Sequence, residues 1–390
     1  MKIGRMCYWN DAGTETPPRE PRSITRARLE LIATLDMLSR RAPKDDWING
    51  ERVRYMIQAG QDSAAVAAAR GCAPLRWRCR VVLAYAFHAS QRFGDAAAEF
   101  DSALAEMSSA ERCRWNDISL LLDDDESAPY DRMPCGQRDS VERHFWELAQ
   151  PSFAVTGNDR RTEHFSRVLL ADLSADGENP YGLGWGPDLR EILIRYGEPL
   201  WYTIPWEAFV AEPSTPTGHD RSPSFHFAPD LSGGAAHWDL YAHTARERYA
   251  PAYMDTITNL AVQFAMVKRG DSALVVAVYG GGMDGTAVLG IAGAGTDSGA
   301  TERTLNHVRR ARAPWKAELV AMEVLGTQSR VDARAREWLR PPSHAEGAPE
   351  LSTLLLFDPD STSDVRSLND ALACALSSNE LRGRRRLGLY

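Results

Sequence analysis

The pattern of apolar and polar positions is clearest between residues 179 and 199. Apolar residues recur there at the three-, four- and seven-residue spacings of one helix face, at Leu189, Ile192, Leu193 and Tyr196. We expect Asp188 to cap the first turn and Glu191 to complete a capping box. Gly197 suits the left-handed position after the last turn. The pattern therefore predicts a short helix with a defined start and end.

A glycine-rich turn precedes this helix. Gly182, Gly184 and Gly186 allow backbone conformations that other residues resist, so we expect a sharp bend that turns Trp185 inward. The interpretation that follows is structural: Trp185 anchors a core, and its replacement by alanine should loosen that core.

Before this segment the chain is helical in pattern. Residues 1–22 are polar and proline-rich and are expected to form an extended lead-in, whereas residues 23–122 show helical periodicity. A helix of large residues followed by an alanine-rich helix occurs twice, about thirty residues apart. The second copy resembles a tetratricopeptide repeat at Tyr85, Phe93, Ala96, Phe100, Ala103 and Leu104. This resemblance implies a partner-binding groove; a small helical cap on the next domain is the alternative.

A second resemblance covers residues 144–200. In order come Phe145-Trp146, the run N-D-R-R-T-E-H-F-S-R from residue 158, Gly184-Trp185 with Asp188, and I-R-Y-G-E-P from residue 194. This order resembles the GWxTD domain family, bacterial proteins of unsettled function that often carry tetratricopeptide-like segments and are often exported. The resemblance implies a mainly helical core over residues 140–200. The motif's threonine is replaced here by Pro187, so any chemistry that needs its hydroxyl is absent.

The last part of the chain has a different pattern. Residues 201–235 are rich in proline, serine and glycine and are expected to be a linker. Within residues 236–390, short apolar runs separated by turn signals predict an antiparallel β-sandwich of immunoglobulin-like type. Resemblance to longer proteins implies that its last strand continues past Tyr390, so a truncated domain is expected. The predicted fold class is α+β with several domains.

Charge and composition narrow the choice of partners. A formal net charge of -8 argues against general nucleic-acid binding, which requires a basic surface. No run approaches the ~20 apolar residues of a membrane helix. The first 22 residues lack the apolar segment of a signal peptide. We therefore expect a cytoplasmic protein if the start is native, and a periplasmic or exported one if a signal sequence has been removed.

The six cysteines form no C-x-x-C pair, so a zinc ribbon is not expected. Cys72 with Cys79, and Cys113 with Cys135, are candidate disulfides for an exported chain. Free buried thiols are the favoured interpretation.

Four histidines fall within twenty-five residues, and imidazoles are common metal ligands: His219, His226, His237 and His243. Their spacing matches no metal motif, and solvated or hydrogen-bonded histidines are the favoured interpretation. The metal alternative would make the protein a metal-dependent hydrolase.

Charged residues gather in the segment that resembles the GWxTD domain: Arg160, Arg161, Glu163, Asp188, Arg190 and Arg195. With Trp185 they are the candidate binding residues, for an acidic ligand. A network of ion pairs that seats two helices is the favoured interpretation, because arginine forks suit carboxylates. No catalytic residue and no cofactor is predicted. The sequence thus favours a non-enzymatic interaction or scaffold protein that binds a protein partner, in an envelope-associated assembly.

Overall fold

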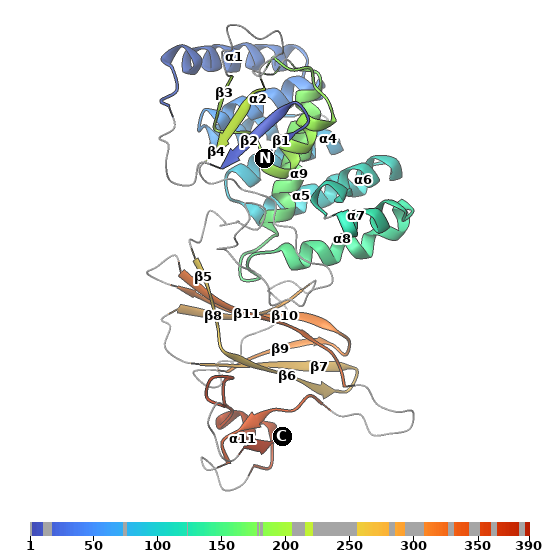
Figure 1. Ribbon diagram of the computed structural model, residues 1–390, viewed down its shortest axis with the longest axis vertical. Helices are drawn as coiled ribbons and strands as arrows, with labels where there is room; N and C mark the ends of the chain where they lie inside the picture. Colours follow the sequence, from blue (N-terminus) through green and yellow to red (C-terminus); the bar gives the residue numbers. More distant parts are fainter. Residues whose placement is uncertain are drawn as a thin grey trace. The chain divides into compact units, whose positions relative to one another are not determined.

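The structure is a computed structural model that describes residues 2–10, 18–72, 76–122, 124–177, 179, 182–204, 215–220, 256–280, 285–292, 308–326, 331–342, 352–359, 365–381 and 387–390. It forms two compact units (Figure 1). The described residues of the first unit lie within 2–149 and 157–220, and those of the second lie within 150–156 and 256–390. The predicted helical N-terminal part and sheet-rich C-terminal part are confirmed. None of the described helices has the length and apolar character needed to cross a membrane.

The first unit is mainly helical. Its helices are α1 (Arg22–Arg41), α2 (Asp46–Gln58), α3 (Asp62–Arg70), α4 (Trp77–Ala89), α5 (Phe93–Glu106), α6 (Ser109–Asn116), the 3-10 turn η1 (Ser119–Leu121), α7 (Asp124–Asp131), α8 (Cys135–Ala149), α9 (Asp159–Ala175) and α10 (Pro187–Tyr196). Helix α9 packs against α4, α5, α8 and α10. Fully buried alanines such as Ala84, Ala96 and Ala103 let α4 and α5 approach closely.

A small sheet belongs to the same unit. It contains β1 (Lys2–Ile3), β2 (Met6–Asn10), β3 (Trp201–Thr203) and β4 (Thr217–Asp220) in the order β1-β2-β4-β3. Strand β2 runs parallel to β4, and β3 runs antiparallel to it. The expected lead-in over residues 1–22 and the linker over 201–235 therefore contain paired strands. Local pattern did not predict them because each strand is short, and because the pairing of β2 with β4 joins residues about two hundred positions apart in the chain.

The second unit is rich in strands: β5 (Thr256–Asn259), β6 (Val262–Arg269), β7 (Ser272–Tyr279), β8 (Gly285–Ile291), β9 (Val308–Pro314), β10 (Glu318–Gly326), β11 (Val331–Leu339), β12 (Leu356–Phe357) and β13 (Gly388–Leu389), with helix α11 (Leu368–Ala373). They form sheets in the orders β5-β11-β10-β8, β6-β7-β9 and β12-β13. Strands β6 and β7 form an antiparallel hairpin, and β5 is parallel to β11.

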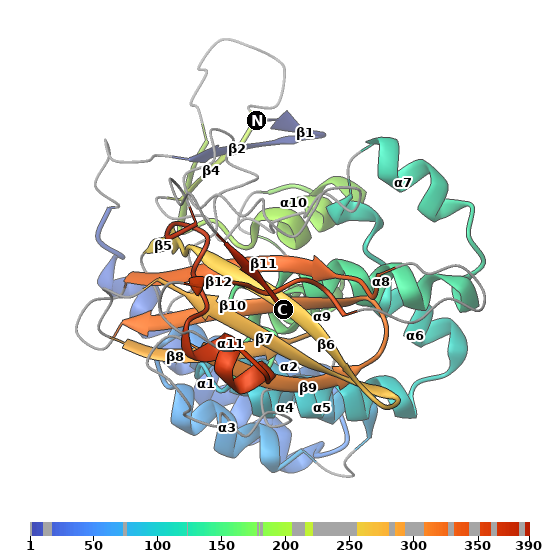
Figure 2. The same cartoon turned by 90° about the horizontal axis from the view of Figure 1, so that it is seen from below.

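Two apolar clusters hold this unit together. One joins residues of β6, β7 and β9 to residues of β8, β10 and β11, including Met266, Val275, Leu289 and Met322. The other joins β6 and β7 to β12 and α11. In Figure 2, helix α11 lies over the sheet that contains β6 and β7. The apolar runs of the sequence do not predict β9, because it alternates arginine with alanine.

Candidate functional site

The charged residues of helix α9 share one carboxylate. Arg160 Nη1 donates to Glu163 Oε2 at 2.9 Å, and Arg167 pairs with the other oxygen of Glu163. Arg160 and Arg167 are both buried. Two buried guanidinium groups share this one carboxylate in a compact network along the helix face.

Arg167 also connects α9 to the end of α10. Its Nη1 donates to the carbonyl oxygens of Ile194 and Arg195 at 3.1 and 2.9 Å. Gly197 ends α10 with a φ of 81°, a value that favours glycine, and a Cβ there would lie 3.4 Å from Arg167 Nη2. Gly197 therefore ends the helix, and the neighbouring Arg167 satisfies the last carbonyls of α10.

Asp188 is not the N-cap residue of α10, because Gly186 holds that position and Pro187 is the first helical residue. Its Oδ1 nevertheless accepts from the backbone N–H of Leu189 at 3.0 Å, so it satisfies a donor of the first turn as predicted. It accepts from the backbone N, Nε and Nη2 of Arg5 at 3.0, 2.8 and 2.8 Å. The bonds from Arg5 hold the pKa of Asp188 well below its usual range. The predicted capping box is wrong, because Glu191 forms an ion pair with Arg195.

The other candidate residues of this segment are also held within the first unit. Trp185 is partly buried and packs against a cluster of Met6, Leu189, Ile192 and Tyr196. The remaining ion pairs are Arg161–Asp101 at 2.7 Å, Arg190–Asp172 at 3.3 Å and Arg195–Glu191 at 3.0 Å. This geometry seats helices and the small sheet against one another, as the favoured interpretation proposes.

Two histidines that the sequence analysis did not single out lie in the same core. His88 Nδ1 lies 2.9 Å from Thr162 Oγ1, and burial lowers the pKa of His88 to about 4. Burial also lowers the pKa of His164 to about 3, with nearby Arg167 acting in the same direction. Both rings are therefore neutral near pH 7. A signal for His164 was present, because it follows Arg160 by four residues on the buried face of α9.

Of the four histidines considered as metal ligands, the structure describes one. The His219 ring stacks on Trp201 with centroids 3.8 Å apart, and its Nε2 lies 2.9 Å from Thr203 Oγ1. His226, His237 and His243 lie outside the described residues. The described contacts of His219 hold strands β3 and β4 together.

The second unit contains a polar arrangement that the sequence analysis missed. The segment 150–156, which joins α8 to α9 in the chain, lies against β10 and β11. Glu323 of β10 is buried and accepts from Ser152 Oγ at 2.5 Å and from the backbone N–H groups of Phe153 and Ala154 at 2.9 Å each. One carboxylate thus satisfies three donors of a connecting segment.

Strand β11 holds the same segment through two arginines. Arg334 donates to the carbonyl oxygen of Pro151, and Arg336 donates to that of Gln150. The Arg336 guanidinium also lies 4.4 Å from the centre of the Phe153 ring. Gly290 of β8 leaves the space, since a Cβ there would lie 2.5 Å from the Phe153 Cβ. We call the side chains of Glu323, Arg334 and Arg336 the segment clasp.

Both candidate disulfides are formed. Cys72–Cys79 and Cys113–Cys135 have Cα separations of 5.7 and 5.8 Å, within the usual range for such bonds. The preference for free thiols at these four positions is therefore wrong. Sequence alone could not decide it, because the pairing depends on how α3 meets α4 and α6 meets α8. Cys7 and Cys374 are free.

No family model, no curated protein and no solved structure matches this chain.

Proposed function

We propose that the chain is a non-enzymatic interaction or scaffold protein that binds a protein partner, with a tetratricopeptide-like region, a GWxTD-like core and a C-terminal β-sandwich. The tetratricopeptide-like part of the proposal is supported by α4 and α5, which pack together and bury every residue of that resemblance: Tyr85, Phe93, Ala96, Phe100, Ala103 and Leu104. The sandwich is supported by the apolar cluster shared between the two larger sheets.

One observation carries the partner-binding function. Leu200, Tyr202 and Ile204 are 65%, 39% and 47% exposed. Alternate residues of an extended segment point to the same side, so Tyr202 of β3 and the residues that flank this strand, Leu200 and Ile204, make one apolar stripe. Strand β3 stands at one end of the strand order of its sheet. Exposed apolar stripes on edge strands are costly in isolation and mark interaction surfaces.

The occupant that fits this stripe is an extended segment of a partner protein with apolar residues at alternate positions. Such a segment adds a strand to the edge of β3 through main-chain hydrogen bonds, and its apolar side chains cover the stripe. The two disulfides are typical of oxidising compartments, and they support placing the interaction in the cell envelope.

The experiment uses a photo-crosslinking amino acid at position 202 in the full chain, with position 29 as the control. Leu29 is another exposed apolar side chain, 47% exposed, on helix α1. The partner crosslinked from position 202 is then purified, and its affinity is measured for the wild type and for Tyr202→Asp and Leu29→Asp. We expect Tyr202→Asp to weaken binding at least tenfold, roughly 1.4 kcal/mol, and Leu29→Asp to leave it unchanged. Equal affinity for all three proteins, or no crosslink specific to position 202, contradicts the proposal.

No observation among the described residues favours the alternative, a metal-dependent hydrolase that uses His219, His226, His237 and His243. The one described member, His219, is engaged by Trp201 and Thr203.

A further inference from the structure

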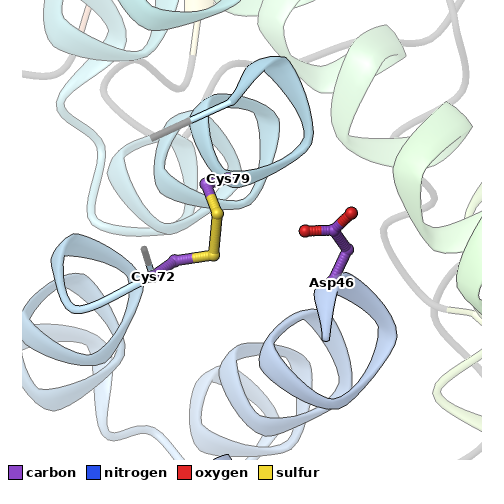
Figure 3. A group of neighbouring side chains, drawn as sticks. All are labelled: Asp46, Cys72 and Cys79. Carbon is purple, nitrogen blue, oxygen red and sulfur yellow. A yellow bond between two sulfur atoms is a disulfide. The ribbon is translucent and has the colours of Figure 1, made fainter. Parts of the chain in front are cut away.

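Three side chains with metal-binding atoms meet at one point of the helical unit. Asp46 is the first residue of α2, Cys72 follows α3, and Cys79 lies in the first turn of α4. One ligand atom from each lies within 4.8 Å of the other two. In Figure 3 the Asp46 carboxylate lies beside the Cys72–Cys79 bond. Both cysteines are only 2% exposed, whereas the Asp46 side chain is 34% exposed, so the group lies just below the surface.

The carboxylate of Asp46 has little to stabilise it. Within the described structure it has one ion pair, to Arg78 at 3.7 Å, and Arg78 is itself 54% exposed. The place of Asp46 at the start of α2 is favourable for an acid, because of the helix dipole. The disulfide brings the two sulfur atoms together beside the carboxylate, and its reduction would leave two thiols and a carboxylate at one place, a donor set that suits a cation of the zinc type.

We propose that Cys72, Cys79 and Asp46 form a binding site for a divalent cation of the zinc type when the disulfide is reduced. The oxidised pair is a covalent link between α3 and α4, and the reduced pair is a ligand set. Metal binding and the disulfide therefore exclude one another. This inference does not depend on the proposed partner binding.

The chemistry balances with a dithiol as the reductant. The dithiol gives two electrons and two protons to the Cys72–Cys79 bond, which becomes two thiols, and the dithiol becomes a disulfide. The cation then displaces the two thiol protons and binds both thiolates and the carboxylate. Zinc–sulfur bonds of about 2.3 Å place tetrahedral ligand atoms about 3.8 Å apart, so the two sulfur atoms have to separate once their bond is broken, whereas a carboxylate oxygen of Asp46 already lies within 4.8 Å of both. The fourth position is left for water.

Cys79 lies in the first turn of α4, where N–H groups of the backbone have no helical acceptor. The other disulfide provides a contrast. Among the residues that the structure describes, no third histidine, cysteine or acidic ligand groups with Cys113 and Cys135. The Cys113→Ser/Cys135→Ser variant is therefore the matched background for the test.

The test titrates Co²⁺ and then Zn²⁺ into this background protein, before and after reduction by a dithiol that is removed under anaerobic conditions. We expect one Co²⁺ per chain in the reduced form only, with a thiolate-to-cobalt charge-transfer band, and displacement of Co²⁺ by Zn²⁺. In the same background, Asp46→Asn should keep both thiols and weaken Zn²⁺ binding about tenfold or more. Further replacement of Cys72 and Cys79 by serine should abolish the band.

Circular dichroism checks that each reduced protein keeps its helices. If the variant with serine at positions 72 and 79 does not fold, the Asp46→Asn variant tests the site in its place. The inference is overturned if the folded, reduced background protein shows no charge-transfer band. It is equally overturned if Asp46→Asn binds Zn²⁺ as tightly as its parent, or if the oxidised protein binds with the same band.

Discussion

The side chain of Asp188 joins two elements that lie 183 positions apart in the chain. Its helix was predicted from the sequence, but its partner was not, since Arg5 belongs to no motif. Both oxygens of the carboxylate are used, Oδ2 by the backbone N and Nε of Arg5 and Oδ1 by its Nη2. Asp188 is therefore a positioning residue that holds the turn between β1 and β2 against the start of α10.

Replacing Asp188 by asparagine should lower the urea midpoint of the helical unit at pH 7, because the fork of Arg5 loses its counter-ion. The lowered pKa of Asp188 means that its contribution is present above the ordinary value near 3.8 and is lost as the pH falls. The difference between wild type and Asp188→Asn should therefore shrink at pH 3. Asp101→Asn is the control, since that carboxylate is 58% exposed and such pairs contribute little. Equal midpoints for wild type and Asp188→Asn at pH 7 would refute the assigned role.

The contribution of Glu142 to stability has the opposite pH dependence to that of Asp188. It is buried in α8 and accepts from Tyr130 Oη at 2.8 Å, and burial raises its pKa from 4.5 to about 7. Its contribution to stability is therefore full below pH 4.5 and is lost as the pH rises through 7.

Replacing Glu142 by glutamine keeps an acceptor for Tyr130 and removes the charge. We expect Glu142→Gln to be more stable than the wild type at pH 8.5, by up to roughly 3 kcal/mol, and nearly equal to it at pH 4.5. Urea unfolding at several pH values measures this. Parallel curves of stability against pH for the two proteins would show that Glu142 does not titrate in this range.

At the scale of elements, the segment clasp binds a connecting segment, residues 150–156, to strands β10 and β11 of a sheet. Glu323, Arg334 and Arg336 are charged residues in the middle of strands, and all three are buried by the segment 150–156. Arg336 lies 4.0 Å from Glu323, so the charges are paired as well as hydrogen-bonded. The clasp satisfies backbone groups of a segment that has no strand partner of its own among the described residues.

Replacing Glu323 by alanine should leave the N–H group of Phe153 without its carboxylate acceptor and that of Ala154 with only Ser152 Oγ, 3.2 Å away, at a cost of about 2 to 4 kcal/mol. Hydrogen exchange of these two amides, read by NMR or mass spectrometry, should accelerate strongly. Glu337→Ala is the matched control, because Glu337 lies on β11 and has no described contact with the segment. If both variants leave the two amides equally protected, the clasp does not hold the segment.

For the whole molecule, the two disulfides lie in one unit only. Cys72–Cys79 and Cys113–Cys135 both join helices of the first unit, whereas the second unit contains the free thiol of Cys374. Cross-links of seven and twenty-two residues each stabilise a fold by about 2 to 3 kcal/mol in the chain-entropy account.

Reduction should therefore destabilise the units unequally. Hydrogen exchange measured with and without a dithiol should show faster exchange in α3, α4, α6 and α8, and unchanged exchange in β10 and β11. Cys374→Ser should behave as the wild type in both conditions. Acceleration spread equally over both units would contradict the assignment of both cross-links to the helical unit.

Sequence by itself determined the elements whose signal is local. The apolar stripe of Leu189, Ile192, Leu193 and Tyr196 is a buried face of α10, and the apolar runs over β6, β7, β8 and β10 are strands. Periodicity reveals such elements because burial of a face imposes a repeat of 3.6 or 2 residues on neighbouring positions. The ion pair between Glu163 and Arg167 is visible for the same reason, at four residues along one helix.

Only the tertiary structure decided which distant groups meet. The partner of Asp188, the strands of residues 2–10, the buried arginines of β11 and the pairing of the cysteines all depend on contacts between remote parts of the chain. The local sequence around an acidic residue does not reveal whether its carboxylate caps a helix, binds Arg5 or binds a connecting segment. Its role is set by the donors that folding brings within hydrogen-bond distance, and no periodicity in the chain records them.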